Sequence, residues 1–252
     1  MRQKLNLDLT TLDRVMMLIQ GPYGAGKTHL QGDFLKWAKQ FGKVAFINIK
    51  GEDGYGSLSA MGLGEIAETA ENLADYDSIV ADYSKQGYYG VAADSLPALE
   101  DLVVRSVMPD GALRYPDPKL DGERAKMLWG QIKMLLRARV TASRSIGKVV
   151  LWVASYDKSE VEGEGKLTAP NLIGKSARAS AGWFDFLGTL TADTKSPTSV
   201  TRSVSFAPST TVLSRQRVAK TITAPIIIPE GGGGWEAIWK ALLAAMPTKE
   251  NK

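Results

Sequence analysis

Residues 21–28 read Gly21-Pro22-Tyr23-Gly24-Ala25-Gly26-Lys27-Thr28, and this order fits the pattern G-x-x-x-x-G-K-[ST] of a phosphate-binding P-loop. Glycines let the backbone turn tightly and approach a phosphate closely. Successive N–H groups then form an anion-binding nest, and the helix that begins near Gly26 adds the positive end of its dipole. We therefore expect these residues, with His29 directly after them, to bind the phosphates of ATP.

The sequence on both sides supplies the context that the motif requires. Residues 14–20 are an apolar run that predicts a short buried strand, and residues 28–41 carry apolar residues at helical spacing. Strand, glycine loop and helix in this order distinguish a P-loop from a chance glycine-rich turn. Lys27 is expected to reach the β- and γ-phosphates, and the Thr28 hydroxyl is expected to hold Mg²⁺.

Composition excludes several other kinds of site. The 252 residues suffice for one large domain with a substantial core. Cysteine is absent, which excludes disulfides, thiolate metal sites and cysteine nucleophiles and fits a reducing cytoplasm. His29 is the only histidine, so a zinc site with several histidines is excluded. No stretch is apolar enough to span a membrane, and we expect no membrane partner.

Charge is distributed unevenly along the chain. Residues 51–123 hold 15 acidic against 4 basic residues, a net charge of −11, whereas residues 124–220 hold 16 basic against 6 acidic residues, a net charge of +10. This asymmetry suits a polyanion-binding face, or contact between acidic and basic surfaces of neighbouring subunits. Solvated surface charge that clusters only in the sequence is the alternative interpretation.

Two further predicted strands lead into acids. Residues 43–49 run into a turn that holds Glu52 and Asp53, and residues 87–95 contain a short strand that ends at Asp94. Ligands of open α/β sheets bind at the carboxyl ends of the strands. Glu52, or else Asp53, is therefore a candidate to orient or deprotonate an attacking water. Asp94 is the candidate Walker B acid for Mg²⁺.

The remaining elements complete an α/β fold. Helices are predicted over residues 64–83, 96–108, 122–145 and 235–246, strands over 147–155, 184–191, 200–206 and 221–228, and loops over 109–121 and 158–181. Residues 1–230 are expected to form a mostly parallel sheet flanked by helices, with a β-hairpin extension towards the C-terminus. Residues 231–252 are expected to form a glycine linker and an amphipathic helix.

Polar features follow the strand predicted at residues 147–155. Ser155, at its carboxyl end, is a candidate contact for the γ-phosphate. The loop predicted after it carries four basic residues that could follow a nucleic-acid backbone, namely Lys158, Lys166, Lys175 and Arg178. A solvent-exposed loop without a ligand is the alternative.

The order of these elements resembles the RecA/KaiC-like ATPase core and, more narrowly, the phage nucleotide-binding proteins, ATPases of the single-strand-annealing recombinase type. The resemblance covers residues 14–228 and rests on residues 21–28, 91–95, 170–175 and 214–220. It implies a RecA-like P-loop ATPase that uses ATP and Mg²⁺ and binds single-stranded DNA in recombination or strand annealing. It also implies a homo-oligomeric ring or filament, other recombination or replication proteins as partners, and the cytoplasm of a bacterial or phage-infected cell.

In such proteins a basic residue of one subunit reaches the γ-phosphate held by its neighbour. The resemblance gives this role to Arg215, Arg217 and Lys220. Their charge would stabilise the transferring phosphoryl group.

One departure from the family pattern opens an alternative function. Lys50 stands where the family has its catalytic glutamate, and Glu52 follows two residues later. A nucleotide-gated structural or assembly factor with little hydrolysis is therefore the alternative. A small-molecule kinase is disfavoured, because the predicted loop at 109–121 carries Arg114 as its only arginine and an arginine-bearing lid is needed.

Overall fold

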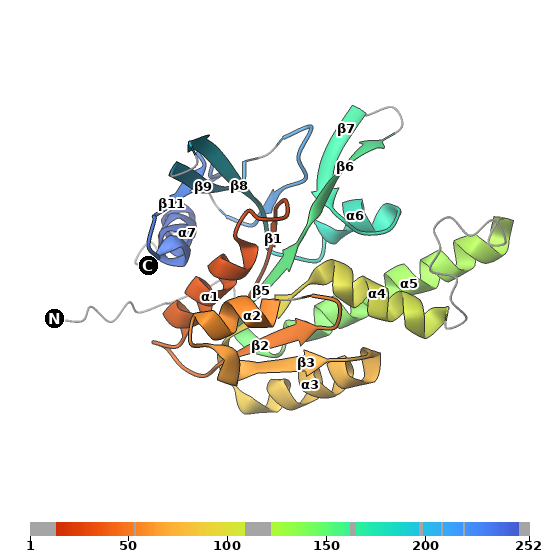
Figure 1. Cartoon of the computed structure of the whole chain (residues 1–252). Coiled ribbons are helices and arrows are strands. Elements are labelled where there is room, and N and C mark those ends of the chain that lie inside the picture. The colour runs from red at the N-terminus through yellow and green to blue at the C-terminus, as the bar shows by residue number, and fades with distance from the viewer. Residues whose placement is uncertain are drawn as a thin grey trace, which may run out of the picture.

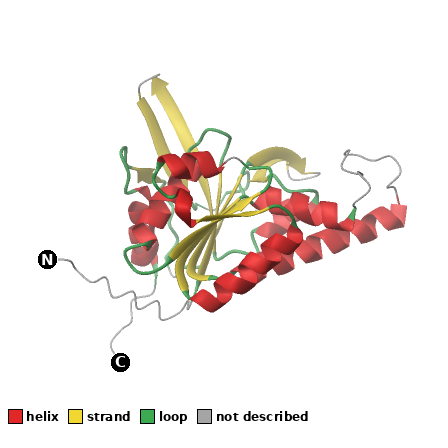
Figure 2. Ribbon diagram, turned by 60° about the horizontal axis from the view of Figure 1, so that its bottom comes forward, coloured by secondary structure: helices red, strands yellow, loops and turns green. Residues whose placement is uncertain are grey.

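The computed structural model describes residues 14–52, 54–108, 122–161, 165–196, 199–207, 209–218 and 220–246. A nine-stranded sheet runs through the described part of the chain, in the order β11-β9-β8-β1-β5-β4-β2-β3, with β10 paired to β8. Helices cover both faces of this sheet (Figures 1 and 2). The expected α/β class, with a mostly parallel sheet flanked by helices, is confirmed.

Six strands make the parallel part of the sheet: β1 (Val15–Gln20), β2 (Val44–Ile49), β3 (Ala67–Ala70), β4 (Tyr88–Asp94), β5 (Gly147–Ala154) and β8 (Phe186–Ser196). Every residue of β1 and β2 is buried, as expected of parallel strands covered on both faces. The antiparallel extension consists of β9 (Ser199–Ser205), β10 (Arg215–Gln216) and β11 (Ile226–Ile228).

Two apolar layers lie on the two faces of the sheet. One is covered by α3 (Leu73–Gln86), α4 (Leu96–Val107) and α5 (Gly122–Ser143), and the other by α1 (Lys27–Ala38) and α7 (Gly234–Ala245). In the second layer, Phe34 and Trp235 have ring centroids 4.6 Å apart, and Trp37 and Trp239 have centroids 5.1 Å apart. The P-loop helix α1 thus packs against α7, the last helix of the described residues.

Asp33 of α1 joins these two helices through its carboxylate. It accepts hydrogen bonds from the backbone N–H of Gly233 at 3.1 Å and of Trp235 at 2.8 Å, at the amino end of α7. Gly231, Gly232 and Gly233 all have positive φ angles, which side chains other than glycine rarely adopt. Residues on both sides of the predicted division between 1–230 and 231–252 belong to the same apolar layer, and the division itself stays a prediction.

The helix predicted over residues 64–83 is confirmed over residues 73–83, within α3, and is wrong over residues 64–72. A short 3₁₀ turn (Gly64–Ile66) leads into β3, which pairs in parallel with β2, and α3 begins only after Asn72. The Asn72 side chain accepts hydrogen bonds from Ala74 N and Asp75 N and so caps α3. The helix α2 (Gly54–Ala60) was not predicted.

The loop predicted over residues 158–181 is also wrong. It contains the antiparallel hairpin of β6 (Tyr156–Val161) and β7 (Gly165–Pro170), followed by α6 (Lys175–Ser180). The hairpin projects away from the main sheet (Figure 1). The strand predicted over 221–228 is confined to Ile226–Ile228, which form β11. The loop predicted at 109–121 lies outside the described residues. No helix in the described ranges is long and apolar enough to cross a membrane.

Candidate functional site

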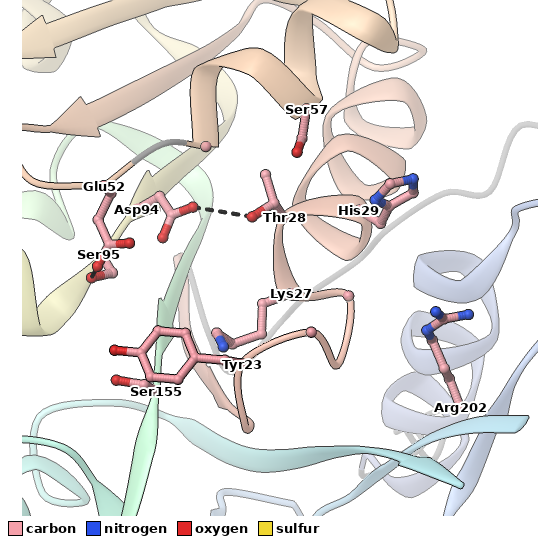
Figure 3. A pocket seen from close by; sticks show the side chains of 13 residues that line it. Tyr23, Lys27, Thr28, His29, Glu52, Ser57, Asp94, Ser95, Ser155 and Arg202 are labelled. Atoms are coloured by element: carbon pink, nitrogen blue, oxygen red, sulfur yellow. Dashed lines mark hydrogen bonds between the residues drawn. The ribbon is translucent and has the colours of Figure 1, made fainter. Parts of the chain in front are cut away.

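A cavity of about 400 Å³ lies over the amino end of α1, at the carboxyl ends of the parallel strands. Its lining comes from the P-loop and the start of α1, the turn after β2, α2, the ends of β4 and β5, and β9 (Figure 3). The lining residues are Tyr23, Gly24, Gly26, Lys27, Thr28, His29, Glu52, Gly54, Ser57, Asp94, Ser95, Ser155 and Arg202. The predicted phosphate site, both predicted acids and the predicted Ser155 thus meet in one place.

The loop between β1 and α1 has the backbone that its glycines predict. Gly24 and Gly26 have φ angles of 77° and 95°, values that favour glycine. Gly21 is needed for a different reason, because a Cβ atom there would lie 2.8 Å from the Leu190 carbonyl oxygen. The predicted members Pro22 and Ala25 close the turn through a hydrogen bond of 3.3 Å from Ala25 N to Pro22 O.

Lys27 folds back over this loop. Its Nζ donates to Gly21 O at 2.9 Å and to Pro22 O at 3.0 Å, and it lies 5.4 Å from the centre of the Tyr23 ring. Burial lowers the pKa of Lys27, while the charge of Asp94 works in the opposite direction. A phosphate in the cavity would give the ammonium a charged partner in place of two neutral carbonyls.

Asp94 ends β4 opposite the start of α1. Thr28 Oγ1 donates to Asp94 Oδ2 at 3.3 Å (Figure 3). Burial, and then the nearby charge of Glu52, raise the pKa of Asp94 to about 7, while Lys27 lowers it. Few partners compensate for the lost hydration of this buried carboxylate, and a hydroxyl lies beside it. Both groups are oxygen ligands of the kind that Mg²⁺ prefers, since Mg²⁺ binds through one or two carboxylates plus substrate phosphates. The described residues contain no cluster of three or more metal-binding side chains.

Glu52 reaches the cavity through the turn after β2, where its N–H donates to Ile49 O at 3.1 Å. Its carboxylate accepts a hydrogen bond from the Ser95 hydroxyl. Lys50 is directed elsewhere and forms an ion pair of 2.7 Å with Glu71. Glu52 therefore lines the cavity although it stands two residues after Lys50, where the family has its catalytic glutamate. The alternative candidate, Asp53, lies outside the described residues.

The predicted basic residues do not line this cavity within the chain. Arg215 donates to Ala181 O at 3.0 Å, Arg217 lies 3.1 Å from Asp185 Oδ1, and the N–H of Lys220 donates to Ala245 O at 3.0 Å. All three were expected to act on a neighbouring subunit, so their role stays a prediction.

The four residues predicted to follow nucleic acid lie in three elements beyond β5. Lys175 and Arg178 belong to α6. Lys158 and Lys166 belong to β6 and β7, where their side chains lie outside the described part of the structure. Their contact with DNA stays a prediction.

Sequence reasoning missed Arg202. This residue of β9 places Nε 3.1 Å from the Ala25 carbonyl oxygen and lines the cavity. It is 177 positions away from Ala25, and only the pairing of β8 with β9 and of β8 with β1 brings the two together. No local motif marks such a residue.

Comparisons with known proteins agree with the fold that carries this site. A family model described as "AAA domain" matches residues 13–218. Among solved structures, a KaiC-like protein of the hyperthermophilic archaeon Pyrococcus horikoshii OT3 is similar, with a TM-score of 0.50 and 14% sequence identity over 87% of this chain and 88% of that chain. At that identity the likeness concerns the fold, and it confirms the RecA/KaiC-like core. No curated protein matches the chain.

Proposed function

The chain belongs to the AAA domain family, and from this premise we propose that it binds Mg²⁺-ATP in the cavity over α1 and hydrolyses it. One observation carries the proposal. The P-loop lysine, the Thr28–Asp94 pair and Glu52 line the same cavity. Phosphoryl transfer to water requires three parts, namely an anion-binding nest, ligands for the metal ion, and a carboxylate that acts on the attacking water.

The residues have separate roles in this mechanism. The N–H groups of residues 24–28 bind phosphate oxygens, and Lys27 leaves its two carbonyl partners to bind the β- and γ-phosphates. Thr28 and Asp94 would hold Mg²⁺, which when bound neutralises charge on the phosphates. Glu52 accepts a proton from, or orients, the attacking water, and the Ser95 hydroxyl holds its carboxylate in place.

The test is nucleotide binding and ATP hydrolysis by the full chain, with Lys27→Ala as the disabled variant. We expect Lys27→Ala to lower both affinity and turnover at least 100-fold, because the lysine contacts charge that grows in the transition state. Lys39→Ala is the matched control, since Lys39 lies exposed at the other end of α1. Equal binding and turnover by the Lys27→Ala variant and the unaltered protein would contradict the proposal.

The alternative, a nucleotide-gated assembly factor with little hydrolysis, shares the binding site and differs in turnover. Tight Mg²⁺-ATP binding without turnover, together with nucleotide-dependent oligomers, would favour it. Two observations support hydrolysis instead. Glu52 lines the cavity, and Lys50 is paired with Glu71 rather than occupying the acid's place.

We further propose single-stranded DNA as the partner, in phage-type recombination or strand annealing. The support is the position of the β6–β7 hairpin, which begins directly after Ser155 at the cavity. The net charge of +10 over residues 124–220 suits a polyanion. A ligand bound to the hairpin would therefore lie close to Ser155, the candidate contact for the γ-phosphate.

DNA-stimulated hydrolysis tests this second proposal. A Lys158→Ala/Lys166→Ala variant should lose the stimulation by single-stranded DNA but keep hydrolysis without DNA. Lys148→Ala, at the opposite end of β5, is the control. Stimulation that survives in the hairpin variant, or that never occurs, would count against DNA at this hairpin.

A homo-oligomeric ring or filament is proposed on the family resemblance and on the charge asymmetry of the chain. In such an assembly Arg215, Arg217 or Lys220 would reach a neighbour's γ-phosphate. Turnover per subunit should then rise with protein concentration, and Arg215→Gln should remove that rise. Turnover independent of concentration, in a protein that sediments as a monomer, would contradict this assembly.

A further inference from the structure

Arg202 reaches the P-loop from a part of the chain that the motif does not include. It pairs with Ala192 across the antiparallel β8–β9 ladder, and β8 lies in parallel beside β1. Its Nε–H donates to the Ala25 carbonyl oxygen at 3.1 Å. Figure 3 shows Arg202 and His29 on one side of Lys27, with Glu52 and Asp94 on the other.

The backbone of the loop is shaped to let this guanidinium approach. A Cβ atom on Gly26 would lie 3.0 Å from Arg202 Nε, closer than a side chain tolerates without displacement of the arginine. The bond to Ala25 uses one of the five N–H donors of a guanidinium. Within the described part of the chain, no ion pair joins Arg202 to an acid. The cation is therefore held at the loop by a neutral carbonyl.

Arg202 also marks the boundary between two cavities. It lines the cavity over the P-loop and an adjoining cavity of about 800 Å³, and Gly26 and His29 line both. Only the first cavity holds the acids that would act at the γ-phosphate, Glu52 and Asp94. A nucleotide with its γ-phosphate near those acids would have its inner phosphates nearest Arg202.

We propose that Arg202 binds an inner phosphate of the nucleotide, one that ADP and ATP share, and that it does so from within the same chain. This inference rests on the proposed function. When a phosphate arrives, the guanidinium exchanges a neutral carbonyl for a charged acceptor, and hydrogen bonds between charged groups are the stronger kind. Arg202 then sets the affinity for nucleotide, while the acids on the opposite side set turnover.

The experiment measures dissociation constants for Mg²⁺-ADP and for a non-hydrolysable Mg²⁺-ATP analogue by titration calorimetry. We expect Arg202→Gln to weaken both about tenfold and by the same factor. KM for ATP should rise more than kcat falls. Arg202→Lys should recover part of the affinity, because its charge remains although its fork geometry is lost.

Arg14→Gln is the matched control, since Arg14 is exposed at the far end of β1 and donates to Arg144 O. It should leave both dissociation constants unchanged. If Arg202 only braced the loop, Arg202→Gln would lower the melting temperature without nucleotide and leave the further rise caused by nucleotide intact. We expect the reverse, with the nucleotide-induced rise reduced.

Three results would overturn the inference while leaving the proposed function standing. They are unchanged affinity in Arg202→Gln, a loss confined to the ATP analogue, and no recovery in Arg202→Lys. Absence of nucleotide binding by the unaltered protein would overturn the proposed function, and the inference with it.

Discussion

Each end of the central sheet holds a buried aspartate, and the two aspartates differ in the number and charge of their partners. At the amino ends of β1 and β8, Asp185 is fully buried and has several partners. Arg144 Nη1 lies 2.6 Å from Oδ2, Arg217 Nη1 lies 3.1 Å from Oδ1, and Met16 N–H donates to Oδ2 at 2.9 Å. At the carboxyl ends, Asp94 has a single threonine hydroxyl at 3.3 Å.

This difference distinguishes an acid whose charge has cationic partners within the chain from an acid with few partners. A buried carboxylate is tolerated when cations and N–H groups compensate for lost hydration. Asp185 forms ion pairs with two arginines, although its Oδ1 accepts no hydrogen bond among the described residues. Lys27, whose charge acts on Asp94, instead donates to two backbone carbonyls. Burial accordingly raises the pKa of Asp94 to about 7. An imbalance of this kind is typical of a functional site.

The largest expected effect is at the structural end. Asp185→Asn should lower the free energy of unfolding by about 3 kcal/mol, because two arginines lose the charge that they surround. Urea unfolding at pH 7 measures it. Asp193→Asn, an exposed position on the same strand β8, is the control and should change stability by less than about 0.5 kcal/mol. A decrease of less than about 1 kcal/mol in the free energy of unfolding of Asp185→Asn would contradict the structural role of Asp185.

At the functional end, Glu52→Gln should act on turnover and leave the fold intact. We expect kcat for ATP hydrolysis to fall about 100-fold, because an amide cannot accept the proton of the attacking water. The affinity for Mg²⁺-ATP should change less than about threefold. Glu71→Gln is the matched control, since this exposed acid pairs with Lys50 near the same turn. Equal kcat values in both variants would move our preference to the assembly factor.

Asp94→Asn should make the nucleotide-free protein more stable in a pH-dependent way. The folded state raises the pKa of Asp94 from its ordinary value of 3.8 to about 7, so the folded state holds the proton more tightly. Stability from this group is present below about pH 4 and is lost as the pH rises through about 7. Asparagine cannot ionise, so the variant should gain about 4 kcal/mol at pH 8 and little at pH 4.

Thermal unfolding at both pH values, and nucleotide binding with and without Mg²⁺, measure this prediction. The variant should also lose the part of its affinity for ATP that depends on Mg²⁺. Asp82→Asn, an exposed acid on α3, is the control. A variant that is less stable than the unaltered protein at pH 8 would place Asp94 with Asp185 among the structural acids.

The functional end was largely predictable from sequence because its signals are local. The P-loop is one continuous stretch, and Glu52 and Asp94 follow apolar runs that end at the same edge of a parallel sheet. The fold class followed from the same alternation of strands and helices. The first part of the helix predicted over 64–83 is wrong because the apolar spacing continues across Asn72, whose side chain caps the helix that begins after it.

The structural end and Arg202 were not predictable in the same way. Asp185 meets Met16 across 169 positions and Arg144 across 41, and Arg202 meets Ala25 across 177. These contacts depend on which strand lies beside β1 and on the register of the β8–β9 ladder. A shift of one residue would turn Arg202 to the opposite face of the sheet. Hydrophobic periodicity alone does not determine that register.

Glu100 provides the finest test of the comparison, because it lies between the two cases. One carboxylate oxygen accepts the N–H of Ile173 at 2.7 Å, whereas Oε1 is buried without a hydrogen-bond partner among the described residues. Burial raises the pKa of Glu100 to about 7, and the Ile173 bond opposes this shift. As with Asp94, a raised pKa means that stability is lost as the pH rises from about 4.5 through 7.

Glu100→Gln should therefore stabilise the nucleotide-free protein by about 3 kcal/mol at pH 8 and have little effect at pH 4. The gain should be smaller than for Asp94→Asn, because the Ile173 N–H already supports the ionised form. Nucleotide affinity should stay unchanged, since Glu100 does not line the cavity over the P-loop. Thermal unfolding and calorimetry measure the two quantities. A loss of affinity in Glu100→Gln would instead make the contact between α4 and Ile173, just before α6, part of the nucleotide site.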